Sequence, residues 1–195
     1  MSTEYAPADL TEPDVAISST LVGERRMVRR EAAAALEKLF AAASEEGSNL
    51  MMGSAYRSAE YQQLLFDTYV ASAGYTEASQ YSALPGHSEH QLGLAVDIST
   101  ASQQCFLSAC FTDTADGQWL ANNAYAYGFT LRYPEGDEGI TGYHFEPWHY
   151  RYVGVDLATA LHQSGLTYEE AWPYLGEALQ TLKDNRAPEV TDADS

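Results

Sequence analysis

Two histidines and an aspartate lie close together in the stretch GHSEHQLGLAVD, which runs from Gly86 to Asp97. Histidine and aspartate are ligands that zinc accepts, and a catalytic zinc site normally holds three protein ligands. His90 and Asp97 are an odd number of residues apart, so one continuous strand would direct them to opposite faces. Both can reach one ion only if His90 lies in a turn before the strand, with Gly93 taking the bend. The HExxH signature of helical zinc proteases is absent, so this stretch alone fits either a metal site or a polar loop leading into an ordinary strand.

A second stretch, GYHFEPWHYRYVG, contains His144, Glu146 and His149. Pro147 forces Glu146 into extended geometry and removes a backbone donor, which predicts an irregular or edge strand where the polar groups gather. His149 would complete a three-ligand set with the first stretch, which leaves Glu146 free as the base that takes a proton from water. In isolation, the same residues also fit a surface strand whose aromatic residues pack and whose His149 is a hydrogen-bonded core histidine.

Alternating apolar residues predict the strand that carries Asp97. The large apolar side chains stand at every second position, namely Leu92, Leu94, Val96 and Ile98. Gly93 and Ala95 fall between them, so the opposite face carries very small side chains until the carboxylate arrives. Such clearance indicates that a ligand or an ion approaches the backbone there.

The periodicity of the remaining chain predicts a mixture of helices and strands. Helical spacing covers residues 29–43, 59–73 and 118–127, and strand-like segments cover residues 50–58, 129–134 and 143–153. No regular βαβ repeat joins them, which predicts an α+β fold rather than a doubly wound sheet. We expect residues 1–22 to form an arm on the domain, residues 23–182 to form the domain itself, and residues 183–195 to be a disordered acidic tail.

Composition limits the classes of function. A chain of 195 residues with 45% hydrophobic content forms one domain with a sizeable core. Its 28 acidic and 10 basic residues give a net charge of -18, which disfavours nucleic acid as a partner. No apolar run approaches the length of a membrane span, and the first residues do not resemble an export signal. Cys105 and Cys110 in CFLSAC fit either a small disulfide loop or two buried free thiols.

Four segments together resemble the zinc D,D-carboxypeptidases of the VanY type, a family that also includes VanX dipeptidases and shares its fold with Hedgehog signalling domains. The segments are SAYRSAEYQ, PGHSEHQLGLAVDI, WLANNAYAYGFTLRYP and ITGYHFEPWHYRYVG, in the family's order. Within them, the patterns SxHxxGxAxD and ExWH are highly specific. The resemblance covers roughly residues 5–154 and implies a small, mostly antiparallel central sheet with flanking helices, the Hedgehog/DD-peptidase fold.

The resemblance also implies the roles of individual side chains. It makes His90, Asp97 and His149 the ligands of a Zn²⁺ cofactor and Glu146 the catalytic base. It assigns Arg57 to the substrate or to the oxyanion that develops during the reaction, which suits the planar donor fork of a guanidinium.

Five further polar residues receive weaker assignments. Gln62 and Ser88 stand where related enzymes hold the terminal carboxylate and the backbone of the peptide. His87 matches the family's GHSEH pattern without being a ligand there, and we expect it to support the loop. His144 is expected to be structural, and His162 in LATALHQSG to lie on the surface of a helix.

The implied activity is removal of a terminal D-Ala from peptidoglycan stem peptides. The motifs leave D,D- and L,D-carboxypeptidase activity open, and dipeptidase or endopeptidase activity depends on loop shape that the sequence does not reveal. The rival classes are a zinc-stabilised binding module without catalysis and an interaction protein that acts through its acidic surface. Because stem peptides lie outside the membrane, we expect an extracytoplasmic monomer whose leader or anchor is missing from this chain, with a cytoplasmic enzyme as the alternative.

Overall fold

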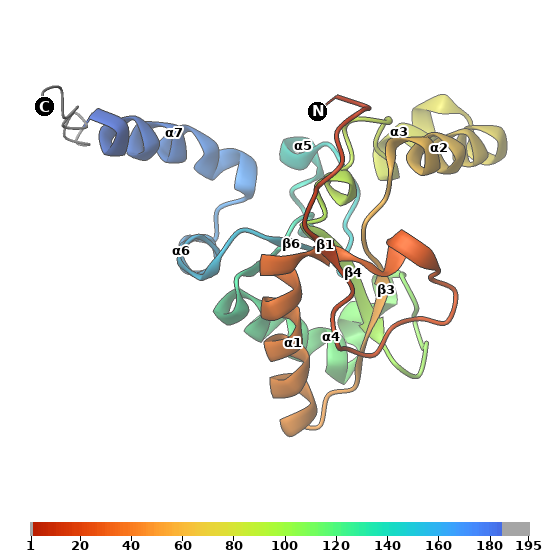
Figure 1. Cartoon of the computed structure of the whole chain (residues 1–195), viewed down its shortest axis with the longest axis horizontal. Helices are drawn as coiled ribbons and strands as arrows, with labels where there is room; N and C mark the ends of the chain where they lie inside the picture. The colour runs from red at the N-terminus through yellow and green to blue at the C-terminus, as the bar shows by residue number, and fades with distance from the viewer. Residues whose placement is uncertain (1, 185–195) are drawn as a thin grey trace, which may run out of the picture.

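The computed structural model describes residues 2–184, which form one body around a four-stranded antiparallel sheet (Figure 1). The strands of this sheet follow the order β3-β4-β6-β5 and comprise β3 (Leu50–Ser54), β4 (Ala95–Thr100), β6 (His149–Tyr152) and β5 (Phe129–Leu131). A second, two-stranded antiparallel sheet joins β1 (Leu10–Thr11) to β2 (Val28–Arg29). The predicted α+β class with a small antiparallel sheet is therefore confirmed.

Seven α-helices and four short 3₁₀ segments are present in the described part of the chain. The helices are α1 (Arg30–Glu45), α2 (Ala59–Ala73), α3 (Tyr75–Tyr81), α4 (Ala115–Asn123), α5 (Glu138–Thr141), α6 (Val155–Ser164) and α7 (Tyr168–Asp184). The 3₁₀ segments are η1 (Gly23–Arg26), η2 (Glu89–Leu92), η3 (Ala109–Asp113) and η4 (Ala124–Tyr127). In Figure 1, α2 and α3 lie together on one side of the sheet, and α7 projects away from the body on the other side.

The predicted helices match α1 and α2 closely, while the third predicted helix is divided. α4 begins before residue 118 and is followed by η4, which ends at Gly128 in a left-handed conformation with φ of 87°. Ser58 begins α2 as its N-cap, because its side chain accepts a hydrogen bond from the backbone N–H of Tyr61.

Three predicted strands are longer than the observed ones, and the strand predicted over residues 129–134 ends at Leu131 in β5. The segment predicted as a strand over residues 143–153 is extended and sheet-bonded only in β6, because the backbone N–H of His149 donates to the carbonyl of Glu146 and closes a turn ahead of the strand. The strand predicted over residues 50–58 ends at Ser54, which leaves the following residues as a connection to α2. The corrections at residues 50–58 and 143–153 place chemically important residues in the connection after β3 and in the turn ahead of β6.

One face of the sheet forms the hydrophobic core against α1. Val96 and Ile98 of β4 and Tyr150 of β6 are fully buried in it, together with Leu36 and Leu39 of α1. Because side chains alternate along a strand, the residues between these positions point to the opposite face. That opposite face carries Asp97 and His149.

Gly93 has a different purpose from the predicted clearance for a ligand. A Cβ atom at this residue would lie 2.8 Å from Cδ2 of Leu10 and 3.1 Å from Cγ of Arg29. The carbonyl of Gly93 also accepts a hydrogen bond from the backbone N–H of Arg29, at 2.8 Å. The prediction was therefore wrong for this residue, since the N-terminal sheet approaches it.

We expect Gly93→Ala to lower the free energy of unfolding by about 1–3 kcal/mol, because the added methyl group clashes with Leu10 and Arg29 and the residue has a positive φ of 67°. Urea unfolding monitored by circular dichroism measures the change. Gly136→Ala is the matched control, because Gly136 has a φ of 90° but nothing within 4 Å of the added Cβ. Equal destabilisation by the two variants would contradict the close contact at Gly93.

The N-terminal segment forms hydrogen bonds with β3, whereas the C-terminal part of the described chain is helical. Residues 16–18 run beside β3, where the N–H of Ser18 donates to the carbonyl of Met52 and the N–H of Met52 donates to the carbonyl of Ala16. At the other end, α7 continues to Asp184, so the first two residues of the predicted disordered tail are helical. The remainder of that predicted tail, residues 185–195, lies outside the described residues.

Cys105 and Cys110 form a disulfide, so the alternative of two buried free thiols was wrong. Their loop lies against β3, since a Cβ on Gly53 would contact the side chains of Phe106 and Leu107. In the part of the chain that the structure describes, no helix combines the length and apolar character of a membrane-spanning segment.

Candidate metal centre and active-site cleft

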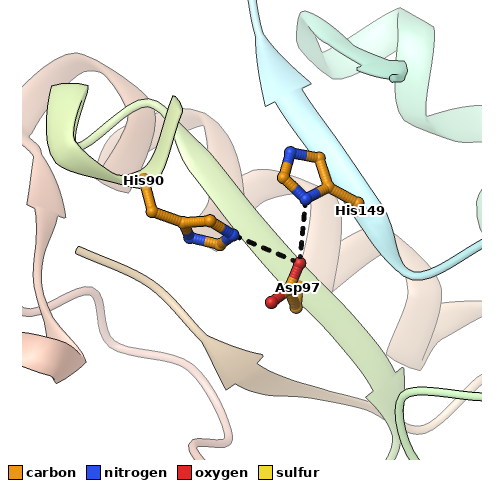
Figure 2. Close-up of side chains that lie close together, drawn as sticks. All are labelled: His90, Asp97 and His149. Atoms are coloured by element: carbon orange, nitrogen blue, oxygen red, sulfur yellow. Dashed lines mark ion pairs between the residues drawn. The ribbon is translucent and has the colours of Figure 1, made fainter. Parts of the chain in front are cut away.

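Asp97 and His149 face each other across two neighbouring strands. They are direct partners in the antiparallel pairing of β4 with β6, so their side chains lie on the same face of the sheet. Nδ1 of His149 lies 3.2 Å from Oδ1 of Asp97 (Figure 2). Both side chains are at least 93% buried. The sheet register therefore brings together two residues that are far apart in the sequence.

His90 approaches the same carboxylate from η2, the 3₁₀ segment ahead of β4. Gly93 ends this segment in a left-handed conformation, which confirms the prediction that His90 lies in a turn and that Gly93 takes the bend. Nε2 of His90 lies 3.5 Å from Oδ1 of Asp97 (Figure 2). Nδ1 of His90 lies 2.7 Å from the carbonyl oxygen of Ala55. Because a carbonyl only accepts, Nδ1 carries the proton and Nε2 keeps a lone pair toward Asp97.

This cluster has the donor set and the charge of a zinc site. One ligand atom from each of His90, Asp97 and His149 lies within 4.8 Å of the others, and two imidazoles with one carboxylate are a common catalytic zinc set. Oδ1 of Asp97 is buried and makes no well-formed hydrogen bond within the described residues, although both rings approach it. An unsatisfied carboxylate oxygen between two imidazole nitrogens is what a bound cation would satisfy.

The pKa values of these residues agree with that interpretation. Burial and the nearby guanidinium of Arg57 lower the pKa of His90 to about 4, so this ring is neutral and able to ligate. Burial alone would lower the pKa of His149, but hydrogen bonding to Asp97 and Glu89 outweighs it and raises the pKa to about 9. Without a cation, the nearby carboxylates therefore favour the protonated, positively charged form of His149. A bound metal cation would supply this positive charge in place of the proton.

Glu146 lies beside the cluster without belonging to it. Its Oε2 atom is 3.5 Å from Nδ1 of His149, and the residue is only 9% exposed. Burial raises the pKa of Glu146 to about 7. A carboxyl group with a pKa in this range can both accept and return a proton near neutral pH.

Arg57 reaches the cluster from the connection between β3 and α2. Its Nη2 atom lies 3.7 Å from Oδ2 of Asp97, and its Nη1 atom donates a hydrogen bond to Oε1 of Gln62 at 3.0 Å. Gln62 is fully buried, and its Nε2 atom donates to Oγ of Ser82 and to the carbonyl of Ala83. Gln62 therefore holds the guanidinium from behind rather than facing the cleft, where the sequence had placed it beside the peptide.

The cluster opens into a cleft of about 580 Å³. Ser88 and His144 line it, and Phe106 and Leu107 of the disulfide loop form part of its wall. Tyr133, which the sequence analysis did not single out, also lines the cleft, and its ring lies 4.8 Å from the ring of His149.

Two histidines lie away from the metal cluster. His87 is exposed, and its backbone N–H donates to the carbonyl of Leu84. His162 is exposed on α6 and stacks on Tyr125 at 3.8 Å, which confirms the predicted surface position on a helix.

Glu89 was also missed from the sequence, where it looks like an acid in a polar loop. Its Oε2 atom lies 3.7 Å from Nε2 of His149, on the side of the ring opposite the cluster. Burial would raise the pKa of Glu89, but His149, Arg132 and Arg151 together lower it to about 2. No short motif indicates this contact, because both arginines come from a distant part of the chain.

Comparison with known proteins gives a consistent set of relatives. The family model VanY, described as D-alanyl-D-alanine carboxypeptidase, matches residues 25–155. The protein YodJ of Bacillus subtilis (strain 168) is 47% identical over 166 residues, which are 85% of this chain and 61% of YodJ. The chain therefore spans less than two thirds of the length of this relative.

Two solved structures share both fold and sequence with the chain. The LD-carboxypeptidase LdcB, whose structure addresses peptidoglycan recognition, has a TM-score of 0.83 and 45% identity, over 88% of this chain and 80% of LdcB. A mutant of the vancomycin-resistance D,D-pentapeptidase VanY, solved in complex with Zn(II), has a TM-score of 0.67 and 36% identity, over 85% of this chain and 92% of that chain.

Proposed function

Because the chain belongs to the VanY family of D-alanyl-D-alanine carboxypeptidases, we propose that it is a zinc-dependent carboxypeptidase that removes a terminal D-Ala from peptidoglycan stem peptides. The observation that carries the proposal is the cluster of His90, Asp97 and His149 with Glu146 beside it at the base of a cleft. A binding module without catalysis has no need of a buried base at this place. The presence of Glu146 therefore favours an enzyme over a binding module and over an interaction protein that acts through its acidic surface.

In this proposal the metal cluster and Glu146 divide the chemistry between them. His90, Asp97 and His149 would hold the zinc ion, which would supply Lewis acidity for the scissile carbonyl and lower the pKa of the water. Glu146 takes a proton from the attacking water and returns one to the amine nitrogen of the departing D-Ala. The raised pKa of Glu146 without a cation, about 7, would fall when a cation binds nearby, which favours the proton-accepting form.

Arg57 and Ser88 are the groups we assign to the substrate. The guanidinium of Arg57 suits either the terminal carboxylate of the peptide or the oxyanion that forms at the attacked carbonyl. Gln62 keeps that guanidinium in place through a hydrogen bond of 3.0 Å. Ser88 is 5% exposed and lines the cleft, where its hydroxyl can hold the peptide backbone.

L,D-carboxypeptidase activity on tetrapeptide stems is the second candidate. It is favoured by the likeness to LdcB, which has the higher TM-score and identity of the two structures compared. The two activities differ in the residue that precedes the terminal D-Ala. This residue is a second D-Ala in the pentapeptide, and it has L configuration in the tetrapeptide. The metal cluster and Glu146 act on the scissile bond in either case, so cleft contacts decide between them.

We expect the zinc-loaded protein to release D-Ala from a synthetic stem pentapeptide faster than from the matching tetrapeptide. Mass spectrometry of the two products measures the rates separately. A chelator should abolish release and added zinc should restore it, which separates this proposal from both non-enzymatic alternatives. Faster release from the tetrapeptide would replace D,D- by L,D-specificity, and no release from either peptide would contradict the proposed function.

We further propose that the protein acts outside the cytoplasmic membrane, where cross-linked stem peptides are found. The disulfide between Cys105 and Cys110 supports this, because disulfides persist in oxidising compartments and are rare in the cytosol. Fractionation of cells that produce the natural protein tests the compartment, and recovery in the cytosol alone would contradict it.

A further inference from the structure

Glu89 and His149 bring two buried polar atoms together on the side of the imidazole away from the metal cluster. Oε2 of Glu89 lies 3.7 Å from Nε2 of His149, and neither atom has a hydrogen-bond partner within the described residues. Buried polar atoms are rarely left unpaired, because each loses its hydrogen bonds to water on folding. A small rotation of the ring would let these two atoms satisfy each other.

The contacts of Nδ1, the ring nitrogen of His149 that points away from Glu89, decide which nitrogen carries the proton. Nδ1 faces Oδ1 of Asp97 at 3.2 Å and Oε2 of Glu146 at 3.5 Å, so Nδ1 is the atom aimed at the cation position. A ligating nitrogen needs its lone pair, so the proton of a neutral ring must be on Nε2. The carboxylate that faces this N–H is Glu89.

Glu89 is itself held by two arginines through its other oxygen. Oε1 accepts a hydrogen bond from Nε of Arg132 at 2.9 Å and lies 3.7 Å from Nη1 of Arg151. Oε2 is thereby left for His149. The side chain of Arg132 is only 8% exposed, so its interactions are weakly screened by solvent.

Arg132 continues the chain of contacts to α7. Its two terminal nitrogens donate hydrogen bonds to the two carboxylate oxygens of Glu169. Such a bidentate pair fixes the orientation of the guanidinium in addition to the attraction between the opposite charges. The guanidinium also lies over the rings of Tyr133 at 5.0 Å and Tyr168 at 5.3 Å. Glu169 lies beyond residues 25–155, the part of the chain that the family model matches.

We propose that Glu89 is a positioning residue that holds His149 in the tautomer and orientation required for metal binding, and that Arg132 extends this support to Glu169 on α7. α7 is then a part of the metal site rather than only a projecting helix. The proposal rests on the metal site of the proposed function and not on which peptide is cleaved. Its tests therefore measure zinc and histidine directly.

We expect Glu89→Gln to weaken zinc binding by about 10- to 100-fold, because outer partners of ligating histidines typically have effects of this size. Competition with a chromogenic chelator measures the Kd, and thermal unfolding of the zinc-free protein verifies that the variant is folded. Glu169→Gln should weaken zinc binding by a smaller factor, about threefold, since it acts through Arg132.

Glu170→Gln is the control for Glu169→Gln. Glu170 is the next residue on α7, and its carboxylate accepts hydrogen bonds from Thr167 rather than from Arg132. It should leave the Kd for zinc unchanged. An unchanged Kd in folded Glu89→Gln overturns the proposal, and equal Kd values for Glu169→Gln and Glu170→Gln remove α7 from it.

A second measurement needs no variant. In zinc-loaded protein with ¹⁵N-labelled histidine, we expect His149 to show a protonated Nε2 and a metal-bound Nδ1. His90 should show the reverse, because its Nδ1 donates to the carbonyl of Ala55. The two rings thus act as internal references for each other. A protonated Nδ1 on His149 would overturn the role of Glu89 even if every variant failed to fold.

Discussion

Glu146→Gln is expected to lower kcat for release of D-Ala by about a thousandfold while zinc binding stays close to that of the parent protein. Glutamine has nearly the same shape as glutamate but cannot take a proton from water, and a positioned acid or base typically contributes between a hundredfold and ten-thousandfold. Glu146 lies 3.5 Å from Nδ1 of His149 without belonging to the ligand cluster, so zinc should remain bound. Steady-state assays with the stem pentapeptide measure kcat, and elemental analysis measures the bound zinc.

Glu135→Gln is the matched control, because Glu135 is an exposed acid in the connection that precedes α5. It removes one negative charge from a chain with a net charge of -18 and should leave kcat unchanged. Substantial turnover by zinc-loaded Glu146→Gln would remove this residue from the role of base. Loss of zinc from the variant would instead make Glu146 a part of the metal site.

The sequence predicts which residues form the candidate metal cluster better than it predicts the strands that carry them. His90, Asp97 and His149 are identified because the patterns SxHxxGxAxD and ExWH together are specific to one family. Neither stretch alone decides between a metal site and ordinary structure, because the pairing of Asp97 with His149 depends on the register between β4 and β6. A register between distant segments arises from the packing of the whole sheet, and local periodicity does not contain it.

Gly93 and Glu89 show two kinds of failure. Gly93 was correctly predicted to take a bend but was also interpreted as clearance for a ligand, whereas Leu10 and Arg29 fill that space. A small residue in a strand pattern indicates a close approach without indicating what approaches. Glu89 was missed because its partners Arg132 and His149 are distant in the sequence, so its position in a polar loop gave no reason to expect burial.

Gln62 was correctly predicted to belong to the site, but it contacts Arg57 rather than the peptide. Its position in YRSAEYQ implies a group that holds the peptide. In the structure, Gln62 lies behind the guanidinium of Arg57 and forms hydrogen bonds with Arg57 and Ser82. A buried amide with several hydrogen bonds fixes the direction of the guanidinium that faces the cleft. Motifs identify such residues as part of a site, but their distance from the substrate depends on tertiary packing.

The loss of one ligand should have the other large effect: His90→Ala is expected to raise the Kd for zinc by more than about 100-fold and to abolish release of D-Ala. Removal of a direct ligand should exceed the 10- to 100-fold effect typical of an outer partner. The substitution also leaves a cavity and an unpaired carbonyl at Ala55, so the zinc-free variant should be less stable than the zinc-free parent. Chelator competition and thermal unfolding, each with and without zinc, measure the two effects.

Two variants separate metal loss from unfolding. His90→Asn can keep a hydrogen bond to the carbonyl of Ala55, because its amide nitrogen lies near the position of the imidazole Nδ1, so it should be better folded than His90→Ala and still bind zinc weakly. His144→Ala removes a histidine that lines the cleft outside the ligand cluster, and it should keep the parent affinity for zinc. Zinc that stabilises the parent and His144→Ala against heat, but neither His90 variant, would be the signature of a direct ligand. Parent-like zinc affinity in either His90 variant would instead exclude His90 from the metal site.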